Sequence, residues 1–115
     1  MKDGMYSINF SAQAGHGFGV LVFEGGRVYG SDAGKAKYDG RYVANPKTGM
    51  VDVNIRVEMP ANQPSVLGIV QPFDWMLDVS TSINPALDRG DIAVNSNLGR
   101  PLRASYDFLR ALPTD

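Results

Sequence analysis

The chain lacks cysteine altogether and contains a single histidine, His16. Without thiols it has no disulfide scaffold, no thiolate metal site and no cysteine nucleophile, and the redox compartment stays open. His16 stands in a glycine-rich stretch with no carboxylates at ligand spacing, so the sequence predicts neither a metal site nor a nucleophile with an imidazole base. We expect no cofactor and no enzyme activity, and an enzyme of unknown type is the least favoured of three functional hypotheses.

Charge of one sign and long apolar runs are also missing. Eleven basic and twelve acidic side chains leave a formal net charge of -1, with no block of like charge. This composition disfavours nucleic acid as a partner, because phosphate binding needs a concentrated basic face. No segment approaches the roughly 20 apolar residues that cross a bilayer, and the first residues lack an apolar signal core. We therefore expect a soluble cytoplasmic protein with no membrane partner.

The clearest positive pattern is a strict alternation of apolar and polar residues over 50–58. Its apolar members are Val51, Val53, Ile55 and Val57. A period of two is typical of a β-strand with one wet face. The same period returns in Tyr6, Ile8 and Phe10, in Phe73, Trp75, Leu77 and Val79, and in Leu102, Ala104, Tyr106 and Phe108. The chain is predicted to be all-β.

Glycine and proline divide the chain into short segments that suit an antiparallel meander. We expect strands near Gly4 to Ser11, Gly17 to Phe23, Val28 to Ser31, Lys37 to Val43, Met50 to Glu58, Ser65 to Val70, Phe73 to Ser80, Asp91 to Asn95 and Leu102 to Leu109. The strands on either side of Gln71 and Pro72 count as one if the proline only kinks the chain. The segment 83–90 is compatible with a short helical turn, and Leu102 to Leu109 also fits a helix.

About eight short strands with one apolar face each predict a closed eight-stranded antiparallel up-and-down β-barrel, as one domain over 1–115. A barrel of this size is filled by its own side chains or holds one small ligand, and both alternatives stay open. The residues expected to face the interior, as candidate ligand contacts, are Tyr6, Phe10, Phe18, Val53, Ile55, Phe73, Trp75, Tyr106 and Phe108.

Two expected strands, 19–23 and 66–70, are apolar on both faces. The side chains assigned to the outside of the barrel are Leu21, Phe23, Leu67 and Ile69. Exposed apolar patches on small β proteins commonly mark an interface. Because twofold dimers are the commonest assemblies, the sequence predicts a homodimer through these residues.

Three landmarks in order carry a resemblance to a known family. They are the opening Met1-Lys2-Asp3-Gly4-Met5-Tyr6-Ser7-Ile8, the pair Gly30-Ser31-Asp32 and Tyr38-Asp39-Gly40-Arg41-Tyr42, and Pro64-Ser65-Val66-Leu67-Gly68-Ile69. In this order and spacing the chain resembles the GrlR family, small negative regulators of type III secretion genes in bacteria. The resemblance implies a lipocalin-type (calycin) barrel, a homodimer, a transcriptional activator as protein partner and a lipid-like ligand inside the barrel.

The chain departs from that family at one place. The acidic surface motif that the regulators use against the activator is replaced by Ala44-Asn45-Pro46-Lys47-Thr48-Gly49. The fold and the dimer therefore carry over better than the partner. Two functional hypotheses follow: a non-enzymatic regulator that acts through protein contact, and a carrier or sensor of a small apolar ligand held in the barrel.

Overall fold

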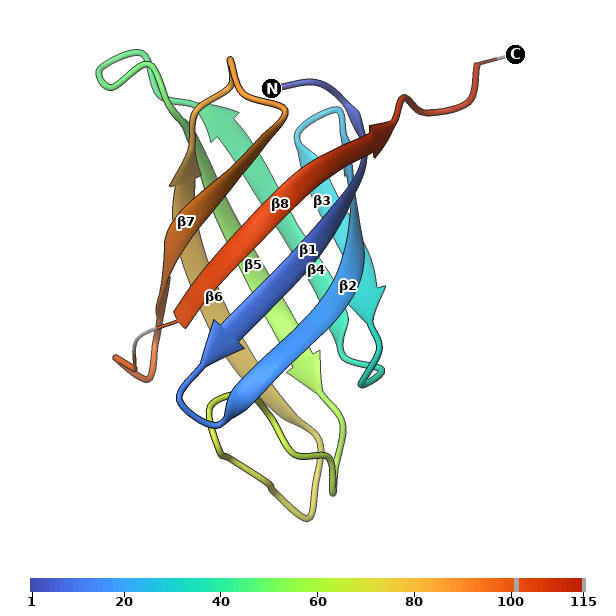
Figure 1. Cartoon of the computed structure of the whole chain (residues 1–115), viewed down its shortest axis with the longest axis vertical. Helices are drawn as coiled ribbons and strands as arrows, with labels where there is room; N and C mark the ends of the chain where they lie inside the picture. Colours follow the sequence, from blue (N-terminus) through green and yellow to red (C-terminus); the bar gives the residue numbers. More distant parts are fainter. Residues whose placement is uncertain (101, 115) are drawn as a thin grey trace.

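The computed structural model describes residues 1–100 and 102–114, and these residues form one closed barrel (Figure 1). The strands are β1 (Gly4–Ala12), β2 (Gly15–Glu24), β3 (Arg27–Asp32), β4 (Lys37–Ala44), β5 (Val51–Met59), β6 (Trp75–Ile83), β7 (Arg89–Ser96) and β8 (Leu102–Arg110). Each strand pairs antiparallel with its neighbours in sequence, and β8 returns to pair with β1. The predicted eight-stranded up-and-down β-barrel is confirmed, and its topology is compatible with a calycin.

The hairpin between β2 and β3 shows how local chemistry sets the register. Glu24 pairs directly with Arg27, so the turn has two residues, Gly25 and Gly26. Their φ angles are 57° and 87°. Positive φ at both turn positions matches the right-handed twist of the flanking strands, and glycine adopts it without strain.

The alternation predicted over 50–58 appears in β5, which begins and ends one residue later. Val51, Val53 and Val57 are buried in the barrel, while Arg56 faces outward and pairs with Asp78 of β6 at 2.9 Å. Across the barrel, the last segment is strand β8 and not a helix, because its inward residues continue the lining beside β1 and β7. Within the segment 83–90, residues 84–88 form a turn without a helix, in which the Leu87 amide donates to the Asn84 carbonyl, while the ends of the segment belong to β6 and β7.

The wall of the barrel is weakest between β6 and β7. Within the described residues these strands pair only through Val79 with Ser96 and Ser80 with Asn95, whereas β7 and β8 pair from Arg89 to Val94. We call the unpaired stretch, 81–83 of β6 facing 92–94 of β7, the β6–β7 seam. One side chain bridges it, since the Thr81 hydroxyl donates to the Ala93 carbonyl at 2.9 Å.

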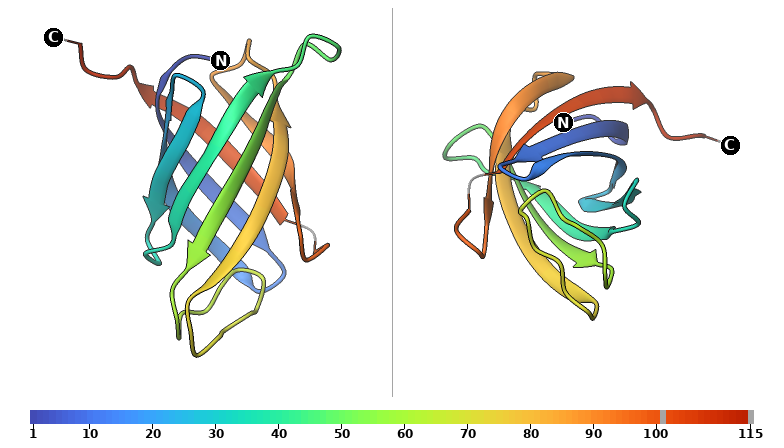
Figure 2. Two further views of the ribbon diagram at one scale, coloured as in Figure 1. Left: turned by 180° about the vertical axis from the view of Figure 1, so that it is seen from behind. Right: turned by 60° about the horizontal axis from the view of Figure 1, so that its bottom comes forward.

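A long connection, the 60–74 loop, joins β5 to β6 and crosses the lower mouth of the barrel (Figure 2). Strand pairing was wrongly expected for Ser65 to Val70 in this region. The Gly68 amide instead donates to the Ser65 carbonyl and the Ile69 amide to the Ser65 hydroxyl, which closes a tight turn. Gly68 has a φ of 79° that ends any extended conformation.

The 60–74 loop is fixed to the barrel by its own backbone. The Val66 carbonyl accepts from the Ala14 amide at 3.0 Å, and the Leu67 carbonyl accepts from Arg100 Nη1 at 2.8 Å. The Leu67 side chain is buried with Ala36, Val57 and Leu77. The lower mouth is therefore closed by an apolar cluster, which we call the lower core.

The upper end of the barrel is closed by aromatic rings. Tyr6 packs edge-on against Phe23 and Phe108, with ring centroids 5.0 and 5.3 Å apart, and Phe23 also contacts Tyr42. The Tyr6 hydroxyl donates to the Lys2 carbonyl at 2.6 Å, which satisfies its polar tip. The aromatic rings bound the interior at its upper end, and the lower core bounds it at the other end.

Candidate functional site

A cavity of about 110 Å³ lies inside the barrel between the upper aromatic rings and the lower core. Its wall is almost wholly apolar, and every strand contributes to it. The central lining residues are Ile8, Leu21, Ile55, Val57, Leu77, Val79, Ile83, Ile92, Val94 and Ala104. The interior is thus neither completely filled nor wide, and an apolar cavity of this kind stays dry until an apolar guest enters.

Five of the residues predicted to face the interior do line this cavity. They are Tyr6, Phe10, Val53, Ile55 and Tyr106. Two others face inward but belong to the closures at the ends: Phe108 packs against Tyr6 in the upper cluster, and Trp75 packs against the lower core. The alternation in β1, β5, β6 and β8 located these side chains correctly.

Phe18 was wrongly assigned to the interior, because its ring is 50% exposed on the outer face of β2. The inward positions next to it are Gly17 and Gly19, which present no side chain to the hydrophobic pattern. Gly17 is small for a packing reason, since a Cβ atom there would collide with the ring of Phe10. The first large side chain of β2 that points inward is therefore Leu21. The inward and outward faces of this strand are exchanged relative to the prediction.

The same exchange of faces overturns the assignment of Leu21 and Phe23 to an outer surface. They are only 6% and 2% exposed and lie in the core of the barrel. Leu67 is buried in the lower core, and Ile69 packs against the same cluster. The apolar character of 66–70 on both faces reflects a loop folded into the barrel mouth, so these four residues do not form a dimer surface.

Phe73 was also wrongly placed inside. It precedes the first residue of β6 and is 58% exposed in the 60–74 loop. The alternation from Trp75 onward is genuine, but Pro72 and the Asp74 side chain, which accepts from the Ala61 amide at 2.9 Å, hold this part of the chain in the loop.

An apolar stripe does exist on the outside, at different positions from those predicted. Val22 of β2 stands between Met5 of β1 and Tyr29 of β3 in the strand register. Val20 and Phe18 continue the same outward face of β2. We call these five residues the outer stripe.

The charged side chain of the cavity wall belongs to Asp32, at the end of β3. Its Oδ2 accepts from the Tyr38 hydroxyl at 2.7 Å, and its Oδ1 accepts from the Ala36 amide at 3.0 Å. Burial first, and then the hydrogen bond to Asp32, raise the pKa of the Tyr38 hydroxyl well above its usual value. The Tyr38 hydroxyl therefore keeps its proton and donates a hydrogen bond that orients the Asp32 carboxylate.

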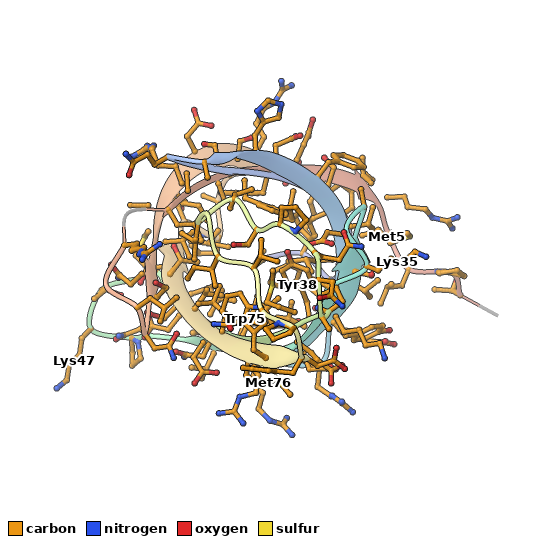
Figure 3. All side chains as sticks on the ribbon, turned by 90° about the horizontal axis from the view of Figure 1, so that it is seen from below. Met5, Lys35, Tyr38, Lys47, Trp75 and Met76 are labelled. Atoms are coloured by element: carbon orange, nitrogen blue, oxygen red, sulfur yellow. The ribbon has the colours of Figure 1, made fainter. Side chains whose placement is uncertain are left out.

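Figure 3 looks into the lower mouth and shows Tyr38 and Trp75 within the ring of strands, under the 60–74 loop, while Lys47 and Met76 point away from it. Trp75 Nε1 is buried and finds no hydrogen-bond acceptor among the described residues. A buried indole N–H without a partner is uncommon in folded proteins. The lower end of the interior therefore holds an unused donor at the edge of the lower core.

Sequence reasoning missed Asp32, Tyr38 and most of the aliphatic lining. For Val57, Leu77 and Ala104 the signal was present, since each belongs to an alternating row that was recognised, whereas Ile92 lies in a segment, 91–95, that was expected only as a strand. Asp32 gave no such signal, because a polar residue before a turn normally reads as a solvated one. Its place in the wall depends on the pairing of Gly30 with Tyr38, which brings β3 and β4 into register.

Among the described residues no three histidine or carboxylate side chains converge as around a metal ion. In the same residues there is no helix of the length and apolarity that a membrane crossing requires.

No protein-family model matches the chain, and no curated protein matches it significantly.

Proposed function

We propose that this protein is a non-enzymatic binding protein that holds a small apolar ligand inside the barrel. The observation that carries the proposal is the cavity inside the barrel with its almost wholly apolar wall. A core built solely for stability is packed to the density of an organic crystal, and voids of this size are few. A ligand that fills the space would recover the dispersion contacts that the lining residues now lack.

The size of the cavity limits the ligand. An apolar cavity of about 150 Å³ takes one benzene molecule, and here the volume is about 110 Å³. Because this volume is smaller than the one that takes benzene, a single small ring or a short aliphatic chain is the largest guest the space admits, whereas a long fatty acid would need the 60–74 loop to move. The ligand that we propose is therefore much smaller than the lipid-like molecule that the family resemblance implies.

Calorimetric titration with toluene tests the proposal, with two leucine substitutions as a matched pair. Ala104 lines the cavity and is buried, whereas Ala93 lies on the neighbouring strand and is exposed. We expect the native protein and Ala93→Leu to bind toluene equally, and Ala104→Leu to lose the binding because the added carbons occupy the cavity. Native protein that releases no heat of binding, or Ala104→Leu that binds normally, would contradict the proposal.

A second candidate function, the cytoplasmic regulator that acts through protein contact, is favoured by the outer stripe. Apolar side chains on three adjacent strands at the surface need a cover, and a second copy of the chain supplies the same stripe in return. We propose a homodimer through the outer stripe, with a transcriptional regulator as the partner of the dimer, in the manner of the GrlR family. The predicted dimer thus moves from Leu21 and Phe23 to their outward neighbours.

Sedimentation velocity tests this candidate. Val22→Glu places a charge in the middle of the outer stripe, while Val43→Glu places the same charge on the exposed outer face of β4. We expect Val22→Glu to be monomeric and Val43→Glu to remain dimeric at the same protein concentration. A native protein that sediments as a monomer at micromolar concentration would exclude this interface.

A further inference from the structure

Asp32 is the one charged residue among the described residues that line the cavity. Its two hydrogen-bond donors, the Tyr38 hydroxyl and the Ala36 amide, are both neutral. The ion pairs of the described residues join Lys2 with Asp88, Lys37 with Glu58 and Arg56 with Asp78, and none involves Asp32. The carboxylate in the wall therefore has no cationic partner in the part of the chain that the structure describes.

The carboxylate also keeps acceptor capacity. An ionised carboxyl group offers about four lone-pair positions, of which the two bonds from Tyr38 and Ala36 occupy one on each oxygen. A half-buried negative charge beside apolar walls attracts a cation more strongly than one in water does. Tyr38 cannot neutralise it, because burial raises the pKa of the Tyr38 hydroxyl and keeps its proton in place.

Two aromatic rings share the cavity wall with Asp32, and the hydroxyl of one of them, Tyr38, contacts the carboxylate. Phe10 and Tyr38 both line the cavity, and their ring centroids are 6.5 Å apart. The faces of such rings attract ammonium groups, and their bodies accept an apolar group equally well. The same end of the cavity thus combines a free carboxylate, two aromatic rings and an aliphatic wall.

We propose that the ligand is a small monoamine, in which a protonated amino group on one ring or a short alkyl chain binds to the carboxylate of Asp32. This inference rests on the proposed ligand-binding function and adds the chemical class. The apolar body fills the cavity, and the ammonium group donates to the free lone pairs of Asp32 at the half-buried edge.

A charge series with one ring tests the inference: benzylamine, benzyl alcohol and benzoate are titrated calorimetrically into the native protein. We expect affinity to fall in the order cation, neutral molecule, anion. In Asp32→Asn the amide oxygen still accepts from the Ala36 amide, so the turn is preserved. We expect this variant to lose about tenfold or more in benzylamine affinity, as for a charge-assisted hydrogen bond, with benzyl alcohol unchanged.

Asp39→Asn is the control, because it removes the same charge from the exposed outer face of β4. It should bind all three molecules as the native protein does. If benzyl alcohol binds and benzylamine is no tighter, or if Asp39→Asn weakens benzylamine as much as Asp32→Asn does, the amine assignment is wrong and the binding function stands. If neither benzyl alcohol nor toluene binds, the binding function itself is wrong. Should Asp32→Asn fail to fold, the order of affinities in the native protein decides alone.

Discussion

Gly30 and Gly40 face the barrel interior where the backbones of neighbouring strands come closest. A Cβ atom at Gly30 would collide with the Val20 carbonyl and stand 2.9 Å from Leu21 Cα. At Gly40 it would collide with the Asn54 carbonyl and stand 2.7 Å from Ile55 Cα. Glycines at these positions let β3 and β4 bend sharply, which a small barrel needs in order to close.

Gly30→Ala should therefore lower the free energy of unfolding by about 1–3 kcal/mol, the usual effect of forcing an extra methyl group into a packed wall. Gly34→Ala is the control, because the nearest atom to its Cβ would be Asp32 Oδ1 at an acceptable 3.4 Å. Urea denaturation of both variants checks the difference. Equal stability of the two would show that the wall at Gly30 is more accommodating than its geometry indicates.

At the scale of elements, the 60–74 loop behaves as part of the core although it contains no strand. Leu67 is 7% exposed and packs in the lower core, while Val70 in the same loop is 54% exposed. The loop is thus attached through one face only, and its attachment depends on a few apolar contacts and on the two backbone hydrogen bonds to Ala14 and Arg100.

Leu67→Ala should cost about 2–5 kcal/mol of stability, because it leaves a void in the lower core. Val70→Ala, at a solvent-facing position of the same loop, should change stability by less than about 0.5 kcal/mol. Thermal unfolding monitored by circular dichroism measures both. A small effect of Leu67→Ala would mean that the lower mouth closes without its side chain.

The β6–β7 seam is the second element-scale feature with a measurable consequence. Thr81→Val removes the hydroxyl that bridges it, and we expect faster amide hydrogen exchange in β7, between Arg89 and Val94. One hydrogen bond of this kind contributes about 0.5–1.5 kcal/mol. The free energy of local opening should fall by roughly that amount, and the exchange rate should rise by the corresponding factor.

Ser82→Ala is the matched control for the seam. The Ser82 hydroxyl donates to Asp52 Oδ1 at 3.0 Å, which joins β6 to β5 and not to β7. Mass-spectrometric exchange should therefore show no acceleration in β7 for this variant. Identical exchange in Thr81→Val and the native protein would show that the bridge does not hold the seam closed.

For the whole molecule, the upper aromatic cluster links stability to alkaline pH. Burial raises the pKa of Tyr6 to about 12, and burial is also the first cause that raises the pKa of Tyr42 and Tyr106. The folded state thus holds these protons more tightly than the unfolded chain, whose tyrosines ionise near pH 10. Stability from this source is complete below about pH 10 and is lost as the pH rises through about 12.

We expect the melting temperature to fall steeply between these two pH values, and to fall less steeply in Tyr6→Phe, which has no proton to lose at that site. Differential scanning calorimetry from pH 8 to 12 measures the two slopes. Tyrosinate absorbance in the same samples provides the control, because it should rise together with unfolding. Parallel slopes in the native protein and Tyr6→Phe would exclude this source.

The barrel itself followed from periodicity, whereas the site followed only in part. The rows led by Val53, Tyr6 and Tyr106 predicted the closed sheet and half of the cavity wall, because each strand has one buried face. Phe18 misled because the inward positions beside it are glycines. A side chain at one of them, Gly17, would collide with the ring of Phe10 on β1. Leu67 and Asp32 owe their places to a loop folded into the mouth and to the register of β3 with β4, and neither leaves a local pattern in the sequence.

The β6–β7 seam also says how this cylinder comes apart. Rupture of the two residue pairs, together with the Thr81 bridge and the hydrogen bonds between Asp78 and Asn97, frees β7 from β6 while β8 stays paired with β1, and the freed edges then seek another strand to complete the ring. In concentrated solution the nearest such strand belongs to a neighbouring molecule, so we expect long storage to yield dimers in which β6 of each chain pairs with β7 of the other.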